Sequence, residues 1–121
     1  MELNGAKVLV VGATGVLGQR LCERLSERTT DIVVTGRSAS AAEELRRGLG
    51  LRAAHALDLV DHDEAAEVVR RAAEELGGLD AVVIATGVAA FGPAADEDEA
   101  VVEELFEVNA LGPMAVLRAA L

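Results

Sequence analysis

Three glycines near the N-terminus have a spacing that suits the binding of phosphate groups. They stand in the segment GATGVLG, directly after an apolar run and before a stretch with helical periodicity. We expect Gly12 to turn the chain sharply, Gly15 to leave space for a pyrophosphate, and Gly18 to let the following helix pack close to the strand. The free amides and the positive end of that helix would hold the phosphates. The candidate residues of this turn are Gly12, Thr14, Gly15, Val16, Leu17 and Gly18.

An arginine and a serine follow the second apolar run, where the sequence reads TGRS. Proteins that bind NAD(H) at such a turn place an Asp or Glu about 20 residues after the first glycines, where it binds a ribose hydroxyl. No acid stands at this position. Arg37 instead offers a guanidinium that can clamp a 2′-phosphate, with Ser38 hydrogen-bonding beside it. The pair therefore predicts NADP(H) in preference to NAD(H).

Two further segments follow the third and fourth apolar runs. Asp58 can accept a hydrogen bond from an adenine amino group, while Leu59 packs on the ring. The small residues Ala85, Thr86 and Gly87 let the backbone pass close to a ribose. Plainer alternatives remain open: a glycine turn without a ligand, a solvated arginine, a turn aspartate and an ordinary loop glycine.

Apolar runs alternate with segments of helical periodicity along the whole chain, and this order predicts an α/β fold. The first and fourth runs are apolar at successive positions, as in strands that are buried on both faces of a parallel sheet. Ser40 and Glu43 have the spacing of a capping box. Asp61 is the expected N-cap of the third helix, and Pro113 is placed to kink the last one. The expected strands are residues 7–11, 31–35, 52–57 and 80–85, and the expected helices are 16–28, 40–49, 62–76 and 97–121.

The composition describes one acidic globular domain of 121 residues. The formal net charge of −10 disfavours binding to nucleic acid and to anionic membranes. With one cysteine, Cys22, and two histidines, His55 and His62, we expect no disulfide and no metal site. The N-terminus does not resemble a secretion signal, and no apolar run approaches the roughly 20 residues that span a bilayer. We therefore expect a cytoplasmic protein.

Five segments together resemble the short-chain dehydrogenase/reductase family in order and spacing. They are GATGVLG, TGRS, LDLVD, DAVVIATGVAAFGP and VNALGPMAVL, and they extend over essentially the whole chain. The resemblance implies an NAD(P)-binding Rossmann domain over residues 1–121, with a parallel sheet of strand order 3-2-1-4 flanked by helices. It also implies hydride transfer between a carbonyl and an alcohol, with Asn109 on the family's active-site asparagine. The family's N-N-A-G segment falls on residues 84–87, where both asparagines are replaced.

The residues that complete the family's acid/base chemistry are missing from the sequence. In the family a tyrosine is the general acid/base, a lysine four residues later lowers the tyrosine pKa, and a serine orients the substrate. This sequence contains no tyrosine, and its one lysine, Lys7, stands in the first strand. The chain thus resembles the truncated first half of a doubly wound domain, and alone it is not expected to transfer protons. It is either a fragment of a longer reductase or a short protein that kept the cofactor-binding half.

A half-domain of this kind leaves apolar surface without cover. In the family's strand order the fourth strand is an edge, and residues 81–84 contain no charge or proline that would prevent pairing with another chain. We therefore expect a homo-oligomer, formed through the strand at 80–85 or the helix at 97–121. Three functions stay open: the cofactor-binding part of an oxidoreductase, a dinucleotide sensor or oligomerisation module without catalysis, and a structural remnant that binds no cofactor.

Overall fold

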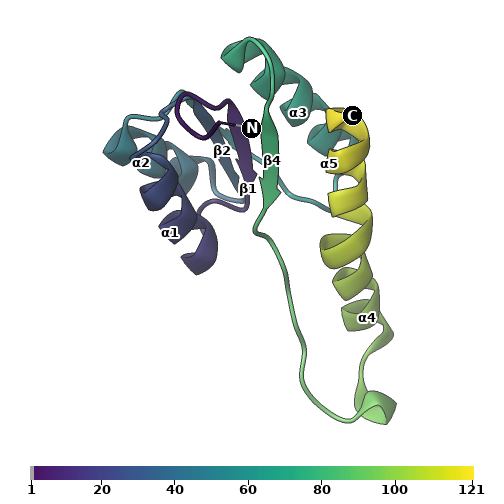
Figure 1. The fold of residues 1–121 in the computed structure, drawn as a ribbon. Helices are drawn as coiled ribbons and strands as arrows, with labels where there is room; N and C mark the ends of the chain where they lie inside the picture. Colours follow the sequence, from purple (N-terminus) through teal and green to yellow (C-terminus); the bar gives the residue numbers. More distant parts are fainter. Residues whose placement is uncertain (1) are drawn as a thin grey trace.

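The computed structural model describes residues 2–121. At its centre lies a parallel sheet of four strands in the order β3-β2-β1-β4 (Figure 1). The strands are β1 (Val8–Val11), β2 (Ile32–Gly36), β3 (Ala53–Ala56) and β4 (Ala81–Ile84). The α/β class and the strand order expected from the sequence are therefore confirmed.

Helices cover both faces of the sheet and alternate with the strands along the chain. α1 and α2 lie on one face, and α3 and α5 lie on the other (Figure 1). The helices are α1 (Val16–Leu25), α2 (Ala39–Leu49), α3 (His62–Leu76), α4 (Glu99–Phe106) and α5 (Gly112–Ala120), with a 3₁₀ turn η1 (Ala94–Asp96) and a π turn η2 (Glu107–Leu111). Within residues 2–121, none of the helices combines the length and the apolar character that crossing a bilayer requires.

The strand β1 is buried because helices cover both of its faces. Val8 and Val10 belong to the core under α1 and α2, whereas Leu9 and Val11 belong to the core under α3 and α5. Each of these four side chains is at most 2% exposed. Full burial of one such side chain contributes about 1.5–3 kcal/mol to stability. β1 is therefore a firm base for the glycine turn that follows it.

The strand β4 forms one edge of the sheet. It pairs with β1, with Val83 opposite Val10, and within residues 2–121 no strand pairs with its other side. Its residues are only half-buried, so the expectation that this run is buried on both sides was wrong. The physical reason is its position, because an edge strand lacks the second neighbour that shields a central strand.

Two helix N-termini show which side chains determine local structure. Asp61 caps α3 as predicted, since its carboxylate accepts a hydrogen bond from the Glu64 amide at 3.0 Å. The capping box predicted at Ser40 was wrong. Ser38 is the N-cap of α2, and its hydroxyl accepts from the Ala41 amide at 3.2 Å. The helix thus begins earlier than expected and lies directly beside Arg37.

The last helical segment is not one continuous helix with a kink at Pro113, as the sequence suggested. The π turn η2 separates α4 from α5, and in it the Gly112 amide donates to the Glu107 carbonyl, five residues earlier. Pro113 has no amide proton for the carbonyl of Asn109, which lies four residues before it. The ordinary helical pattern is therefore lost at this point, and a π turn takes its place. Asn109 lies within this turn.

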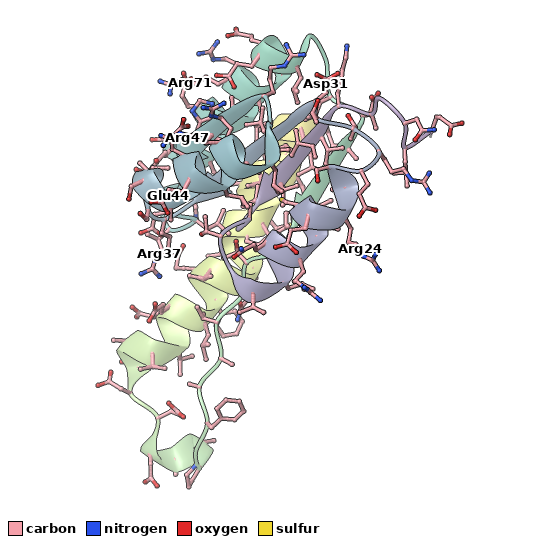
Figure 2. All side chains as sticks on the ribbon, turned by 90° about the vertical axis from the view of Figure 1, so that its left-hand side faces the viewer. Arg24, Asp31, Arg37, Glu44, Arg47 and Arg71 are labelled. Carbon is pink, nitrogen blue, oxygen red and sulfur yellow. The ribbon has the colours of Figure 1, made fainter. Side chains whose placement is uncertain are left out.

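A long segment after β4 extends away from the sheet and returns through η1 and α4 (Figures 1 and 2). Its exposure is extreme at Phe91, whose side chain is 95% exposed. The segment leaves the sheet at the carboxyl end of β4, so α4 stands beyond the carboxyl ends of the strands. This places one helix face beside the loops that carry the predicted site residues.

Candidate functional site

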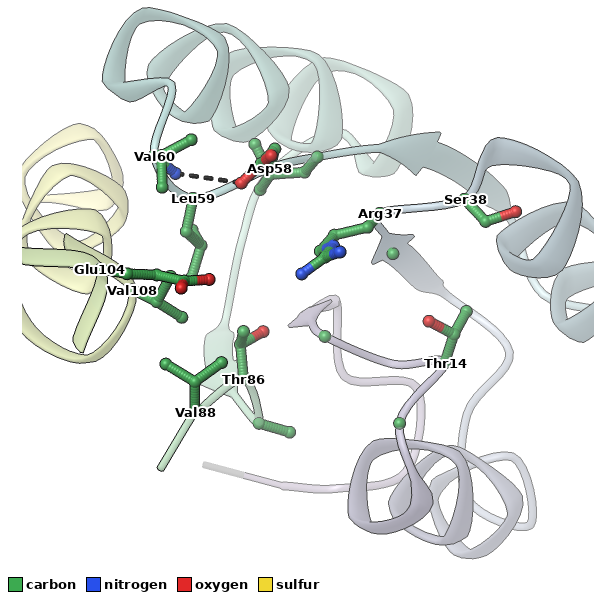
Figure 3. A pocket seen from close by; sticks show the side chains of 16 residues that line it. Thr14, Arg37, Ser38, Asp58, Leu59, Val60, Thr86, Val88, Glu104 and Val108 are labelled. Carbon is green, nitrogen blue, oxygen red and sulfur yellow. Dashed lines mark hydrogen bonds between the residues drawn. The ribbon is translucent and has the colours of Figure 1, made fainter. Parts of the chain in front are cut away.

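A cavity of about 670 Å³ opens at the carboxyl ends of the four strands (Figure 3). Its walls come from the loops after each strand, together with residues of α4 and η2. Ligands of open parallel sheets bind at this edge, where loops from neighbouring strands diverge. The position of the cavity therefore makes it the candidate site.

Most of the residues predicted to bind a cofactor lie together in this cavity. All of them line it except Val16, Leu17 and Gly18. Sequence analysis missed six lining residues, which are Gly36, Leu57, Val60, Val88, Glu104 and Val108. The first four adjoin predicted residues in the chain. Glu104 and Val108 come from the distant helical segment, and their spacing of four residues on one helix face was the only signal available.

The glycine turn has a conformation that larger residues cannot adopt. Gly12 has a φ of +79°, and a Cβ there would collide with the Thr86 side chain and lie 2.9 Å from the Thr86 amide nitrogen. A Cβ at Gly18 would collide with the Gly12 carbonyl oxygen and lie 2.8 Å from the Ala13 Cα atom. Gly12 thus makes the sharp turn, and Gly18 allows the close approach of helix and strand, as expected from their spacing.

The N-terminus of α1 is open at Gly15. A Cβ at this residue would meet only the Gly12 carbonyl oxygen, at 3.7 Å, and no side chain caps the helix. The first amide bonded along the helix is that of Gln19, which donates to the Gly15 carbonyl at 2.9 Å. The earlier amides of α1 therefore have no helical acceptor and are available to an anion. Val16 and Leu17 do not line the cavity, and they are 88% and 72% exposed.

The strand β2 holds the glycine turn in place. The fully buried Thr35 accepts a hydrogen bond from the Gly12 amide at its Oγ1 atom, at 3.3 Å, and one from the Ala13 amide at its carbonyl oxygen, at 2.8 Å. Its neighbour Gly36 has no side chain, and a Cβ there would lie 2.6 Å from the Thr14 hydroxyl oxygen. The end of β2 must therefore be small for Thr14 to lie against it.

Arg37 extends its side chain from the end of β2 into the cavity (Figure 3), and it lies at the surface of the molecule (Figure 2). Across residues 2–121 the Arg37 guanidinium forms no ion pair with a carboxylate within 4.0 Å. Ser38 also borders the cavity, but its side chain points away from the centre and caps α2. Arg37 therefore supplies a free positive charge, while Ser38 chiefly orients the helix beside it.

Asp58 and Leu59 form the wall after β3. The Asp58 carboxylate accepts a hydrogen bond from the Val60 amide at 3.3 Å, which leaves its second oxygen available (Figure 3). Leu59 is only 3% exposed. A Cβ at Gly112 would lie 2.6 Å from the Leu59 carbonyl oxygen, so α5 packs directly on this loop. Leu59 therefore joins the core and the cavity wall.

Asn109, which the sequence resemblance placed on an active-site asparagine, holds the loop after β4. Its Oδ1 atom accepts from the Val88 amide at 2.9 Å, and its Nδ2 atom donates to the Val88 carbonyl at 2.7 Å. A Cβ at Gly87 would lie 3.4 Å from Oδ1, so a small residue helps this close approach. Asn109 itself does not line the cavity. Its amide is therefore used to position the wall formed by Ala85, Thr86 and Gly87.

The remaining nucleophilic and titratable candidates have structural roles. Cys22 is fully buried on the face of α1 that packs on the sheet, and burial raises the pKa of its thiol to about 11, so it stays protonated and unreactive near neutral pH. His55 contacts Glu75 at 3.0 Å, and His62 contacts Glu107 at 3.1 Å. Among residues 2–121 no three His, Cys, Asp or Glu side chains are grouped to hold a metal ion.

Comparison with known proteins agrees with this arrangement. A model of the short chain dehydrogenase family matches residues 6–121. A short chain dehydrogenase of Pseudocercospora fijiensis is 26% identical over 126 residues, which cover 99% of this chain and 41% of that protein. A crystal structure assigned as a short-chain alcohol dehydrogenase from Sinorhizobium meliloti 1021 is 36% identical, with a TM-score of 0.89 over 98% of this chain and 49% of that one.

A second solved structure was determined with a nucleotide bound. It is a short chain dehydrogenase from Burkholderia cenocepacia in complex with NADP, 29% identical, with a TM-score of 0.89 over 99% of this chain and 51% of that one. The chain spans about half the length of these solved structures and less than half of the curated relative. Since the family match runs from before β1 to the end of the sequence, the chain belongs to the short-chain dehydrogenase family.

Proposed function

We propose that this chain binds NADP(H) and forms the cofactor-binding part of a short-chain dehydrogenase oxidoreductase. The observation that carries the proposal is the uncapped N-terminus of α1, where the glycine turn borders the cavity. Free amides and the helix dipole at this point favour a diphosphate. The NADP complex of the Burkholderia cenocepacia relative supports the choice of ligand class.

The residues present fit the diphosphate, the adenine and a ribose of such a cofactor. Gly15 leaves open space for the diphosphate, while Asp58 and Leu59 stand where they can receive the adenine. Ala85 and Thr86 border the cavity on the side of β4, where the backbone can pass a ribose. When bound, NADP(H) supplies or accepts the hydride, and the chain's own residues bind and orient it.

A preference for NADP(H) over NAD(H) is part of the proposal, and it rests on Arg37. The guanidinium reaches into the cavity at the end of β2 and has no carboxylate partner there. A free arginine attracts a 2′-phosphate, whereas the ribose hydroxyls of NAD(H) are bound by an acidic residue at this position. No acidic residue follows β2 before α2 begins.

We further propose that this chain does not itself move the proton of the reaction. The sequence contains no tyrosine, and the Lys7 ammonium donates to the Gly77 carbonyl at 3.0 Å, at the opposite end of the sheet from the cavity. The Asn109 amide is occupied by Val88. The chain's contribution is therefore to hold the cofactor.

Since Cys22 is a buried free thiol, we also propose a reducing, cytoplasmic location.

A second candidate function is an oligomerisation module whose assembly follows cofactor occupancy. The observation that favours it is apolar surface on the last helices together with the unpaired outer edge of β4. Phe106, Leu111, Met114 and Leu117 are between 43% and 63% exposed. We propose a homo-oligomer formed through this surface. A measurement of molar mass in solution, with and without NADPH, tests it, and a clean monomer at high concentration would contradict it.

Titration with NADPH tests the main proposal. The sequence has no tryptophan and no tyrosine, so a change in the emission of the reduced nicotinamide is free of protein background. We expect enhanced emission and a higher melting temperature. Gly15→Val should abolish both while leaving the fold intact, because the open space at Gly15 accepts a larger side chain. Gly48→Val, in open space on α2, is the control. No response at millimolar NADPH, or unchanged binding by Gly15→Val, would overturn the proposal.

A further inference from the structure

One carboxylate in the cavity has no role in the cofactor binding proposed for this chain. Glu104 of α4 lines the cavity, and its carboxylate points into it (Figure 3). Val108, one helical turn later, lines the same wall and is only 7% exposed. The Glu104 carboxylate has no hydrogen bond or ion pair with another side chain in residues 2–121. Glu104 is exposed, and its carboxylate is therefore free to accept a hydrogen bond from a ligand in the cavity.

The packing of the helices places Glu104 on the side of the cavity that belongs to the loop after β3. The helical segment that carries Glu104 continues through η2 to Gly112, which lies against the Leu59 carbonyl. Leu59 directly follows Asp58, the other carboxylate that lines the cavity. The phosphate-binding turn and Arg37 form the walls after β1 and β2 instead.

A carboxylate accepts hydrogen bonds and repels phosphate, so its partner must be a hydrogen-bond donor on an uncharged part of the ligand. The 6-amino group of adenine carries two protons. Asp58 uses one oxygen for the Val60 amide and has another free. Two carboxylates on one side of the cavity can therefore accept both amino protons, one each. A 6-oxopurine would instead present an acceptor oxygen at position 6, so that only its N1–H could donate to one of the two carboxylates.

Resting on the proposed NADP(H) site, we propose that Glu104 is a specificity-determining residue that acts with Asp58 to select adenine as the base of the cofactor. The juxtaposition of Glu104, Val108 and the loop after β3 carries the inference. Val108 supplies an apolar wall for the ring, and the two carboxylates accept from its amino group. The class of ligand favoured is a 6-aminopurine dinucleotide over a 6-oxopurine dinucleotide.

The experiment compares the dissociation constants of NADPH and of its hypoxanthine analogue, in which the 6-amino group is replaced by oxygen. We expect the unchanged chain to bind NADPH about tenfold more tightly or better, since each hydrogen bond lost or left unpaired costs a few-fold in affinity. Glu104→Gln should reduce this ratio by about three- to tenfold, because an amide can donate to the 6-oxo group. The far-ultraviolet circular dichroism spectrum of Glu104→Gln should match that of the unchanged chain, which is the check that the variant is folded.

Glu103→Gln is the matched control. It changes the net charge equally on the adjacent residue, but Glu103 does not line the cavity, so the ratio should stay unchanged. Equal binding of both dinucleotides by the unchanged chain would overturn base selection. A Glu104→Gln variant that alters both affinities alike would show that the carboxylate acts only through its charge, and would also overturn it. Binding of neither dinucleotide would refute the proposed function itself.

Discussion

Gly18→Ala is the substitution that tests the geometry of the glycine turn most directly. The new methyl group would collide with the Gly12 carbonyl oxygen and lie 2.8 Å from the Ala13 Cα atom. Carbon atoms in contact are separated by about 3.5–4.0 Å, so α1 must move by roughly 1 Å. Both neighbours are backbone atoms, which cannot rotate away as a side chain can. The substitution therefore opens the contact on which the turn depends.

The expected loss of stability follows from two opposing effects. Overpacking costs about 1–3 kcal/mol, and a rigid backbone neighbour places this case at the upper end. Replacing glycine by alanine within a helix stabilises the helix by about 1 kcal/mol. The net destabilisation is about 2 kcal/mol, which for a domain of this size lowers the melting temperature by about 8 °C. NADPH binding should weaken as well, because the displaced helix carries the free amides.

Gly48→Ala provides the matched control for this measurement. Gly48 lies inside α2, and a Cβ there would have nothing within 4 Å. The same substitution should therefore stabilise the protein by about 0.5–1 kcal/mol. Urea unfolding of both variants, followed by circular dichroism at 222 nm, measures the change in unfolding free energy that each substitution causes. We expect a decrease for Gly18→Ala and an increase for Gly48→Ala. If Gly18→Ala proves as stable as Gly48→Ala, the close approach of α1 to the turn is refuted.

Three further predictions concern the site and the core. Arg37→Asp should weaken NADPH binding by about tenfold or more and favour NADH, whereas the exposed Arg47→Asp on α2 should not; an unchanged preference in a titration would remove Arg37 from the site. Asn109→Ala leaves the Val88 amide and carbonyl without partners, so the unfolding free energy should fall by about 1 kcal/mol and proteolysis after β4 should accelerate. An unchanged rate of proteolysis after β4 in Asn109→Ala would show that the Asn109 bonds to Val88 do not hold this loop. The raised pKa of Cys22 means that folding favours the neutral thiol, so this contribution is complete below the unfolded pKa of about 9 and is lost as pH rises to about 11. Cys22→Ala should reduce the fall in stability over that range, and an identical pH profile would contradict the assignment.

Much of the architecture was predictable from the sequence, because the apolar runs and the helix-capping residues indicate the same elements that the structure forms. The valine-rich run of β1 is apolar at every position, and it is buried on both faces. The Asp61 cap was identified from residue type and position alone. The capping box at Ser40 was not, because serines at 38 and 40 offer the same chemistry. Only the path of the chain from β2 decides which of them meets the free amides.

The candidate site was predictable where its residues follow a strand. Gly12, Arg37 and Asp58 each stand directly beyond an apolar run, and parallel strands bring their carboxyl ends to one edge. Glu104 and Val108 could not be found in this way, because they lie on a helix. The π turn before Pro113 and the packing of Gly112 on Leu59 set the rotation of that helix, and with it the side chains that reach the cavity.

The sequence by itself determined the order of elements, the glycines that a close-packed turn requires and the absence of a tyrosine, because these follow from residue type and spacing. Tertiary structure alone decided that Asn109 bonds to Val88, that Ser38 caps α2 and that Glu104 faces the cavity. The Asn109 bonds and the position of Glu104 each depend on two segments that are distant along the chain and meet through the packed core, whereas the Ser38 cap depends on the path by which the chain leaves β2. The spacing of residues along the chain does not reveal which distant segments will lie next to each other.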